Sequence, residues 1–260
     1  YDVSDEVQNC QVVLSGRRQG KHSFIHKSLL NFCSEIPFKG NFIEIACGNG
    51  LLSSKFAVEH PEWECVAVDP SVGSGTLISS NVKFVRDFFD PALFDGKRFD
   101  VIVAHGILNR TPTLELLEGI ASLANKNALI SIEIVTLENS IFAPYIWDHS
   151  YTFLEETFCE YLNSFGIIVE ERVNCGSTVQ FICKYNGSNL PPPLAIPESI
   201  INSTHRLYQN HVLQWDKIKK KFSESLSLLK KQKVSLFGAG LYNAVLVSLI
   251  NKSHIDVVID

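Results

Sequence analysis

Hydrophobic residues in the first two thirds of the chain form short runs that alternate with longer amphipathic stretches. Short apolar runs are typical of strands buried on both faces of a sheet, whereas the amphipathic stretches have helical periodicity. The strands predicted are residues 42–45, 65–68, 82–85, 99–104, 128–135, 167–173 and 179–185. The helices predicted are residues 21–32, 113–123 and 152–165, with a further helix that begins at Leu51.

The alternation of strand and helix predicts an α/β fold, namely a doubly wound sheet of seven strands. The last two strands follow each other around Asn174, Cys175 and Gly176, with no room for a helix between them. This connection predicts a hairpin, and therefore an antiparallel last strand at an otherwise parallel sheet.

The last third of the chain has a different pattern. Residues 186–197 contain three consecutive prolines, which cannot enter a helix or a central strand, and predict a linker. Residues 198–232 form a long amphipathic pattern, and residues 233–260 read strand, Gly-Ala-Gly turn, helix, strand. We therefore expect one domain over 1–185, a Pro-rich linker, a long helix, and the start of a second Rossmann-like unit over 233–260.

A candidate ligand site follows the first predicted strand. Gly48 and Gly50 allow a tight turn and a close approach of the backbone to a ligand. The turn leads into a helix whose free N–H groups favour an anionic or polar ligand. Glu44 lies at the end of the strand, where open α/β sheets bind ligands.

A second acid, Asp69, ends the next buried strand and is suited to accept hydrogen bonds from both hydroxyls of a ribose. A glycine-rich turn with a ribose acid also describes a dinucleotide site. The spacing here is Glu44-x-Ala46-x-Gly48-x-Gly50, however, and not that of the dinucleotide motif. An acid at this junction repels a pyrophosphate but suits a zwitterionic amino acid.

This stretch resembles the first motif of class I S-adenosylmethionine (SAM)-dependent methyltransferases, with Ala46 where the first glycine of the motif is usual. The resemblance implies SAM as the cofactor and the seven-stranded sheet as the fold. It implies that the cofactor is bound by Glu44, Ala46, Gly48, Gly50 and Asp69.

Four stretches resemble, more narrowly, the sugar C-methyltransferases with an appended C-terminal domain. They are RDFFDPALFDGKRFDVIVAHGIL, IWDHSYTF, the GST triplet at 176–178, and VSLFGAGLYNAVLV. The resemblance implies that Asp87 accepts the adenine amino group, with Phe88 beside the ring. The family's first active-site histidine and its N-terminal zinc-binding cysteine cluster are missing, and a Lys-Gly-Asn reads Leu-Tyr-Asn, so oxygen methylation of a related sugar stays an alternative.

His149 is the strongest candidate for a catalytic base, because it follows the central strand, is flanked by Asp148 and matches the family's second active-site histidine. Tyr151 is a candidate for orienting the substrate, with a helix-capping core residue as its alternative. His105, which follows the fourth strand, is expected to line the cofactor pocket.

The composition limits which kinds of partner and which metal sites are expected. A net charge of −5 gives no support for nucleic acid, and no apolar run reaches the length of a membrane span. The seven cysteines lack CxxC pairing. Cys47, Cys65 and Cys183 lie in apolar strand contexts and indicate buried thiols of a cytoplasmic protein, and no metal site is expected.

Three classes of function are compatible with these patterns. The first is methylation of a nucleotide-activated sugar for polysaccharide or glycoside synthesis. The second is methylation of another small polar metabolite, and the third is a NAD-binding oxidoreductase or a non-catalytic nucleotide-binding module. All three take a small-molecule ligand, and the sequence leaves the oligomeric state open.

Overall fold

The structure is a computed structural model. It describes residues 39–72, 81–140, 143, 149–187, 198–228, 234–237 and 255–259. The helix expected over 21–32, residues 188–197 of the Pro-rich linker, the Gly-Ala-Gly turn and Asp148 lie outside these residues.

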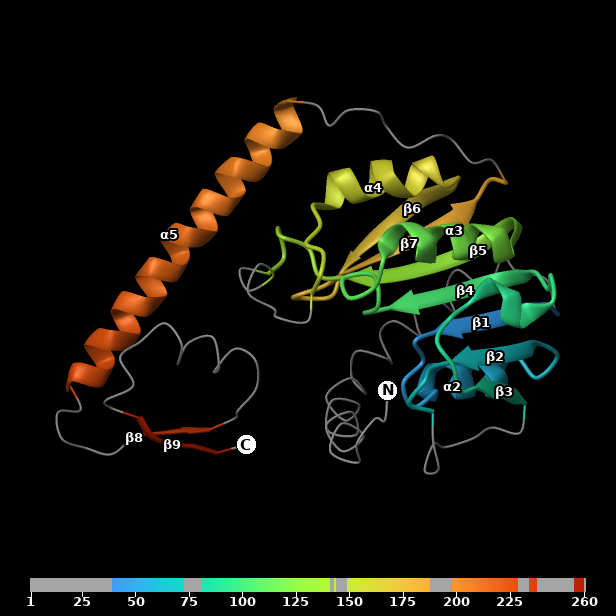
Figure 1. The fold of residues 1–260 in the computed structure, drawn as a ribbon, viewed down its shortest axis with the longest axis horizontal. Coiled ribbons are helices and arrows are strands. Elements are labelled where there is room, and N and C mark those ends of the chain that lie inside the picture. Colours follow the sequence, from blue (N-terminus) through green and yellow to red (C-terminus); the bar gives the residue numbers. More distant parts are fainter. Residues whose placement is uncertain are drawn as a thin grey trace.

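A sheet of seven strands forms the centre of the molecule, in the order β3-β2-β1-β4-β5-β7-β6 (Figure 1). The strands are β1 (Asn41–Ile45), β2 (Glu64–Val68), β3 (Val82–Val85), β4 (Phe99–His105), β5 (Ala124–Ile134), β6 (Ile167–Asn174) and β7 (Val179–Tyr185). The first five strands run parallel, and β7 is antiparallel to both of its neighbours. The doubly wound seven-stranded fold predicted from the sequence is confirmed.

Each face of the sheet has its own hydrophobic core. On one face the 3₁₀ helix η1 (Pro91–Phe94), α3 (Thr113–Leu123) and α4 (Glu155–Ser164) pack with apolar residues such as Ile102, Ile130 and Phe158. On the other face α2 (Leu51–Glu59) contributes Phe56, which stacks on Phe42 with ring centroids 4.2 Å apart. Burial on both faces explains why the strands are continuous apolar runs.

Three cysteines lie in these cores or beside them. Cys47, Cys65 and Cys183 are buried and unpaired, as the sequence predicted. Burial raises the pKa of Cys65 to about 12 and the pKa values of Cys47 and Cys183 further, because a thiolate is poorly solvated there. These thiols are therefore chemically inert in the folded state.

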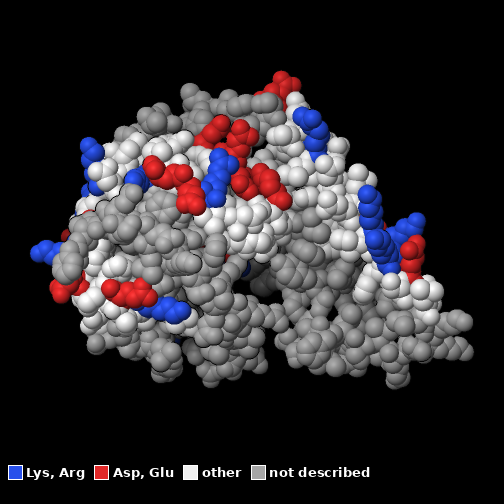
Figure 2. All heavy atoms as spheres, turned by 180° about the vertical axis from the view of Figure 1, so that it is seen from behind, with Lys and Arg blue, Asp and Glu red and all other residues white. Residues whose placement is uncertain are grey.

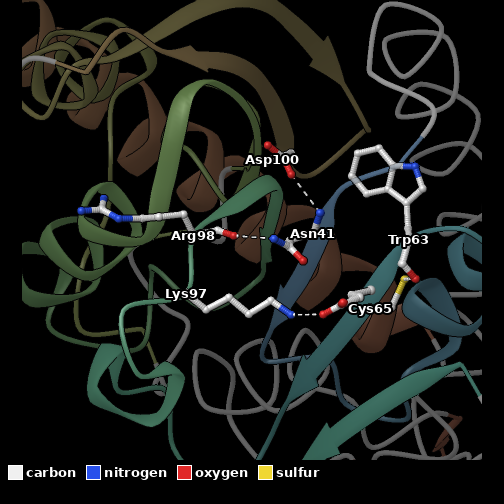
Figure 3. A network of polar contacts seen from close by, with 7 residues as sticks. Asn41, Trp63, Cys65, Lys97, Arg98 and Asp100 are labelled. Carbon is white, nitrogen blue, oxygen red and sulfur yellow. Dashed lines mark hydrogen bonds and ion pairs between the residues drawn. The ribbon is translucent and has the colours of Figure 1, made fainter.

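A polar network joins the strands at the edge where β1, β2 and β4 begin (Figure 3). The Asp100 carboxylate accepts hydrogen bonds from the Asn41 backbone N–H at 2.9 Å and from the Asn125 side chain at 2.7 Å. Lys97 Nζ lies 2.6 Å from the Glu64 carboxylate. Asp100 thus links β1 to β5 across β4, at the edge opposite to the predicted ligand site.

The C-terminal part consists of α5 (Glu198–Leu228) and a parallel pair, β8 (Val234–Phe237) and β9 (Ile255–Ile259). In Figure 1, α5 stands apart from the sheet on the left of the view, and β8 and β9 lie below it, near its C-terminal end. Figure 2 shows Lys and Arg side chains along this helix, where Lys217 and Lys219 to Lys221 are exposed. Among the residues described, no helix combines the length and hydrophobicity needed to cross a membrane.

Candidate functional site

The predicted site residues lie at one edge of the sheet, where the parallel strands end. Ala46 follows β1, Asp69 follows β2, and Asp87 lies two residues after β3. His105 is the last residue of β4. The carboxyl ends of parallel strands are where open α/β sheets bind their ligands, so the topology brings together residues from distant parts of the sequence.

The loop after β1 adopts left-handed backbone at Ala46, Gly48 and Gly50, with φ values of 57°, 56° and 66°. The two glycines have different surroundings. A Cβ on Gly50 would lie 2.3 Å from the Phe84 ring, whereas a Cβ on Gly48 would meet nothing within 4 Å. Gly50 therefore allows the loop to pack on β3, and Gly48 borders open space that a ligand can use.

This difference predicts unequal effects of two alanine substitutions. Gly50→Ala should lower the free energy of unfolding by about 2–5 kcal/mol, because left-handed backbone and overpacking both oppose it. Gly48→Ala should cost only the backbone contribution of about 1–2 kcal/mol. Urea denaturation of both variants measures the difference, and equal losses would contradict the packing of Gly50 on Phe84.

Asp69 is buried at the end of β2, and protein donors already occupy much of its carboxylate. One oxygen accepts the Gly48 backbone N–H at 2.8 Å, and the other accepts the Ser71 N–H at 2.8 Å and the Ser71 hydroxyl. Because a carboxylate has about four lone-pair positions, one remains for a ligand. Binding of both ribose hydroxyls, as predicted, requires the Ser71 hydroxyl to turn away.

Glu44 is buried under the loop and only 4% exposed. Its carboxylate accepts the Ser53 backbone N–H at 2.9 Å and the Ser53 hydroxyl, and so binds the first turn of α2. Burial, with a smaller contribution from the nearby Asp69 carboxylate, raises the pKa of Glu44 to about 7 against the opposing effect of these bonds. This geometry suits a residue that supports the loop by holding the start of α2 against the end of β1.

The raised pKa predicts that Glu44 makes the stability of the domain depend on pH. The folded state holds this proton to about pH 7, whereas the unfolded chain releases it near 4.5. The stabilising contribution is therefore full below pH 4.5 and is lost as the pH rises through 7, on the order of 3 kcal/mol in all. Denaturation of the wild type and Glu44→Gln between pH 4.5 and 8 should show this relative fall; parallel curves would contradict it.

The groups predicted to contact adenine lie on the exposed surface after β3. Phe88 is 65% exposed, which is unusual for a large aromatic side chain. One oxygen of the Asp87 carboxylate accepts the Phe88 backbone N–H at 2.8 Å. An acceptor, an exposed ring and the open space at Gly48 are features that a nucleoside with an amino-acid tail requires, and in this respect the edge fits the predicted cofactor.

Asn109, which the sequence analysis did not single out, holds the segment that contains His149 and Tyr151. Its backbone carbonyl accepts the N–H groups of Ser150 at 2.7 Å and Tyr151 at 3.1 Å. Its side-chain amide donates to the carbonyls of Tyr151 and Val135, both at 3.0 Å, and accepts the Val135 N–H at 2.9 Å. Asn109 thus joins the ends of β4 and β5 to this segment.

We expect Asn109→Ala to loosen that segment. The partly buried Val135 N–H loses its partner, which costs up to about 1–3 kcal/mol, the penalty for a fully buried donor. Amide hydrogen exchange should accelerate at Val135, Ser150 and Tyr151. Asn125→Ala, which removes one 2.7 Å bond to Asp100 at the opposite edge, is the matched control and should leave these amides unchanged. Equal exchange in both variants would contradict the role of Asn109.

His149 is half-buried in this segment, and the Tyr151 side chain is 41% exposed, with its ring stacked near Phe153. The last histidine at the edge, His105, lies on β4, and its Nε2 is 2.8 Å from the Ser131 hydroxyl. In the described part of the chain, no group of three His, Cys, Asp or Glu side chains is placed to hold a metal ion.

Several solved structures have a similar fold. A candidate O-methyltransferase from Nostoc punctiforme PCC 73102 has a TM-score of 0.51 and 13% identity, over 67% of this chain and 58% of that chain. A complex of the Haloferax volcanii Trm112 methyltransferase activator with a candidate methyltransferase gives 0.50 and 11%, over 65% and 94%. An O-methyltransferase family protein from Burkholderia thailandensis gives 0.49 and 15%, over 65% and 57%.

The present chain therefore spans a little over half the length of the Burkholderia protein. The two matches with TM-scores of 0.50 and 0.51 show the fold alone, because their identities are so low. Among curated proteins no match was found. A family model described as a methyltransferase domain matches residues 17–167, which is more than half of the chain. The matched region contains the glycine loop, Asp69, His105, Asn109 and His149. The chain belongs to the methyltransferase domain family.

Proposed function

We propose that this enzyme transfers a methyl group to a sugar, in the form of a nucleotide-activated sugar of polysaccharide or glycoside biosynthesis. The observation that carries the proposal is the position of the His149–Tyr151 segment. Its sequence resembles the active-site segment of the sugar C-methyltransferases, and Asn109 fastens it beside the ends of β4 and β5. Acceptor chemistry is expected at that place, next to the cofactor loop on β1.

SAM supplies an electrophilic methyl group on a sulfonium, so the chain must bind the acceptor, orient it and remove its proton. We assign proton removal to His149 and orientation of the acceptor to the exposed Tyr151. Cofactor binding is assigned to the loop from Ala46 to Gly50, to Asp69 and to the Asp87–Phe88 pair, with Glu44 supporting the loop and His105 at the border with the acceptor.

The family finding removes the NAD-dependent alternative, and methylation of another small polar metabolite is the competing proposal. Isotope-labelled SAM incubated with UDP-, GDP- and dTDP-hexoses tests the two. Label in a nucleoside diphosphate sugar supports a sugar acceptor, and NMR of the product distinguishes a C-methyl from an O-methyl group. Label found only in other metabolites or in RNA, offered in parallel, would contradict it.

The division of the chain into functional parts also stays a proposal. We assign methyl transfer to residues 1–185 and connection to the linker 186–197. The long helix, expected over 198–232, is described over Glu198–Leu228. β8 and β9 pair in parallel and belong to the second α/β unit proposed for residues 233–260.

A further inference from the structure

A row of three polar residues crosses the sheet at the edge where the methyl acceptor is expected. His105 on β4 lies directly opposite Glu133 on β5, and Glu133 lies directly opposite Gln180 on β7. Directly opposed residues point to the same face of a sheet. The side chains of His105, Glu133 and Gln180 therefore lie side by side. They are on the same face of the sheet as α2, which covers this face nearer to β1 and β2.

Farther from this edge, much of the same face is apolar. Val101, Val103, Leu129 and Ile182 belong to its hydrophobic core. Glu133 is only 7% exposed and Gln180 is fully buried. Burying such groups opposes folding unless they are hydrogen-bonded, so packing alone does not account for them.

Hydrogen bonds to Ser131 and Thr178 hold the three side chains of the row in place. The Gln180 amide donates to the Ser131 hydroxyl at 2.9 Å, and Ser131 lies 2.8 Å from Nε2 of His105. The Thr178 hydroxyl donates to Glu133 at 2.5 Å. The buried carbonyl oxygen of Gln180 has no hydrogen-bond partner in the described part of the protein.

The geometry points to this row as the subsite for the hydroxyl groups of the methyl acceptor, with the Glu133 carboxylate and the Gln180 carbonyl as acceptors. The inference rests on the proposed sugar substrate. Carboxylate and amide oxygens bind the O–H groups of a polyhydroxylated ring, and a buried carboxylate forms charge-assisted bonds with them. Ser131 and Thr178 hold the row in place, and His105 borders the cofactor half of the edge.

Kinetics with the UDP-, GDP- and dTDP-hexoses at saturating SAM test this assignment. Glu133→Gln keeps the shape of the side chain but removes its charge. It should raise the KM for the sugar by about tenfold or more, while the Kd for SAM changes by less than about twofold. Thr178→Val, a milder change that removes one hydroxyl, should raise the same KM by a smaller factor.

Glu171→Gln, the same change at an exposed position on the edge strand β6, is the matched control and should leave the KM unchanged. An unchanged KM in folded Glu133→Gln and Thr178→Val would overturn the subsite, as would a Kd for SAM that rises in step with the KM. Wild-type protein that methylates none of these sugars would instead contradict the sugar substrate, and with it the ligand assigned to the row.

Discussion

His149→Gln is expected to lower turnover by about 10²–10⁴-fold, the usual contribution of a positioned general base. Glutamine resembles histidine in size and hydrogen-bonding capacity, but it cannot accept a proton at neutral pH. The backbone bonds from Asn109 hold the neighbouring Ser150 and Tyr151, so the segment should keep its place in the variant. The Kd for SAM should barely change, because the base serves the acceptor.

Methyl transfer to the sugar identified as substrate measures the turnover, and calorimetry measures the Kd for SAM. His60→Gln is the matched control: His60 follows α2 at its far end, packs on Phe56 and should be nearly silent. Equal losses of turnover and SAM affinity would make His149 a structural or cofactor-pocket residue. Turnover within a few-fold of wild type would place the base elsewhere, with Tyr151 and His105 next to be tested.

The second large effect is expected at Asp69. Asp69→Ala should weaken SAM binding by about 1.5–3 kcal/mol, which corresponds to about 10–150-fold in Kd, because a charge-assisted bond to the ribose is lost. The variant also releases the Gly48 N–H and Ser71, so the loop loses support. Calorimetric titration with SAM gives the Kd.

Asp100→Ala is the control that separates the lost bond to the ribose from a general loss of stability. Asp100 also accepts a backbone N–H and a second donor, but it does so at the opposite edge of the sheet. Both variants should unfold more easily, and only Asp69→Ala should lose affinity. Ser71→Ala frees a lone pair of Asp69 and should bind SAM at least as tightly as the wild type. An unchanged Kd in folded Asp69→Ala would refute the assignment.

Most of the fold could be predicted because buried parallel strands are recognisable as continuous apolar runs. The errors occur where tertiary contacts override local preference. β5 begins at Ala124, four residues earlier than predicted, because Ala124 pairs with Phe99 and left-handed Asn127 absorbs the irregularity. α4 begins at Glu155, since Phe153 forms a bridge with Thr136 in place of a helical turn.

The candidate site was accessible from the sequence only where a motif marks it. The glycine loop and Asp69 follow such a motif, whereas Asn109 acts through backbone groups that any residue possesses. A signal for Glu133 and Ser131 was present: polar residues two apart in a central strand depart from the continuous apolar pattern that burial on both faces requires. Their partners Gln180 and Thr178 come from a distant hairpin, and only the register reveals them.

Because the buried thiols react only when the structure around them opens, their rates of labelling measure local opening of the unmodified protein. Cys47 lies in the loop that follows β1, whereas Cys183 is fully enclosed on β7 between two strands. A thiol reagent reaches Cys47 when the loop opens, but it reaches Cys183 only when the sheet comes apart. A ligand that closes the loop therefore protects Cys47 well before it protects Cys183, so the order of labelling distinguishes occupancy of the site from general stabilisation.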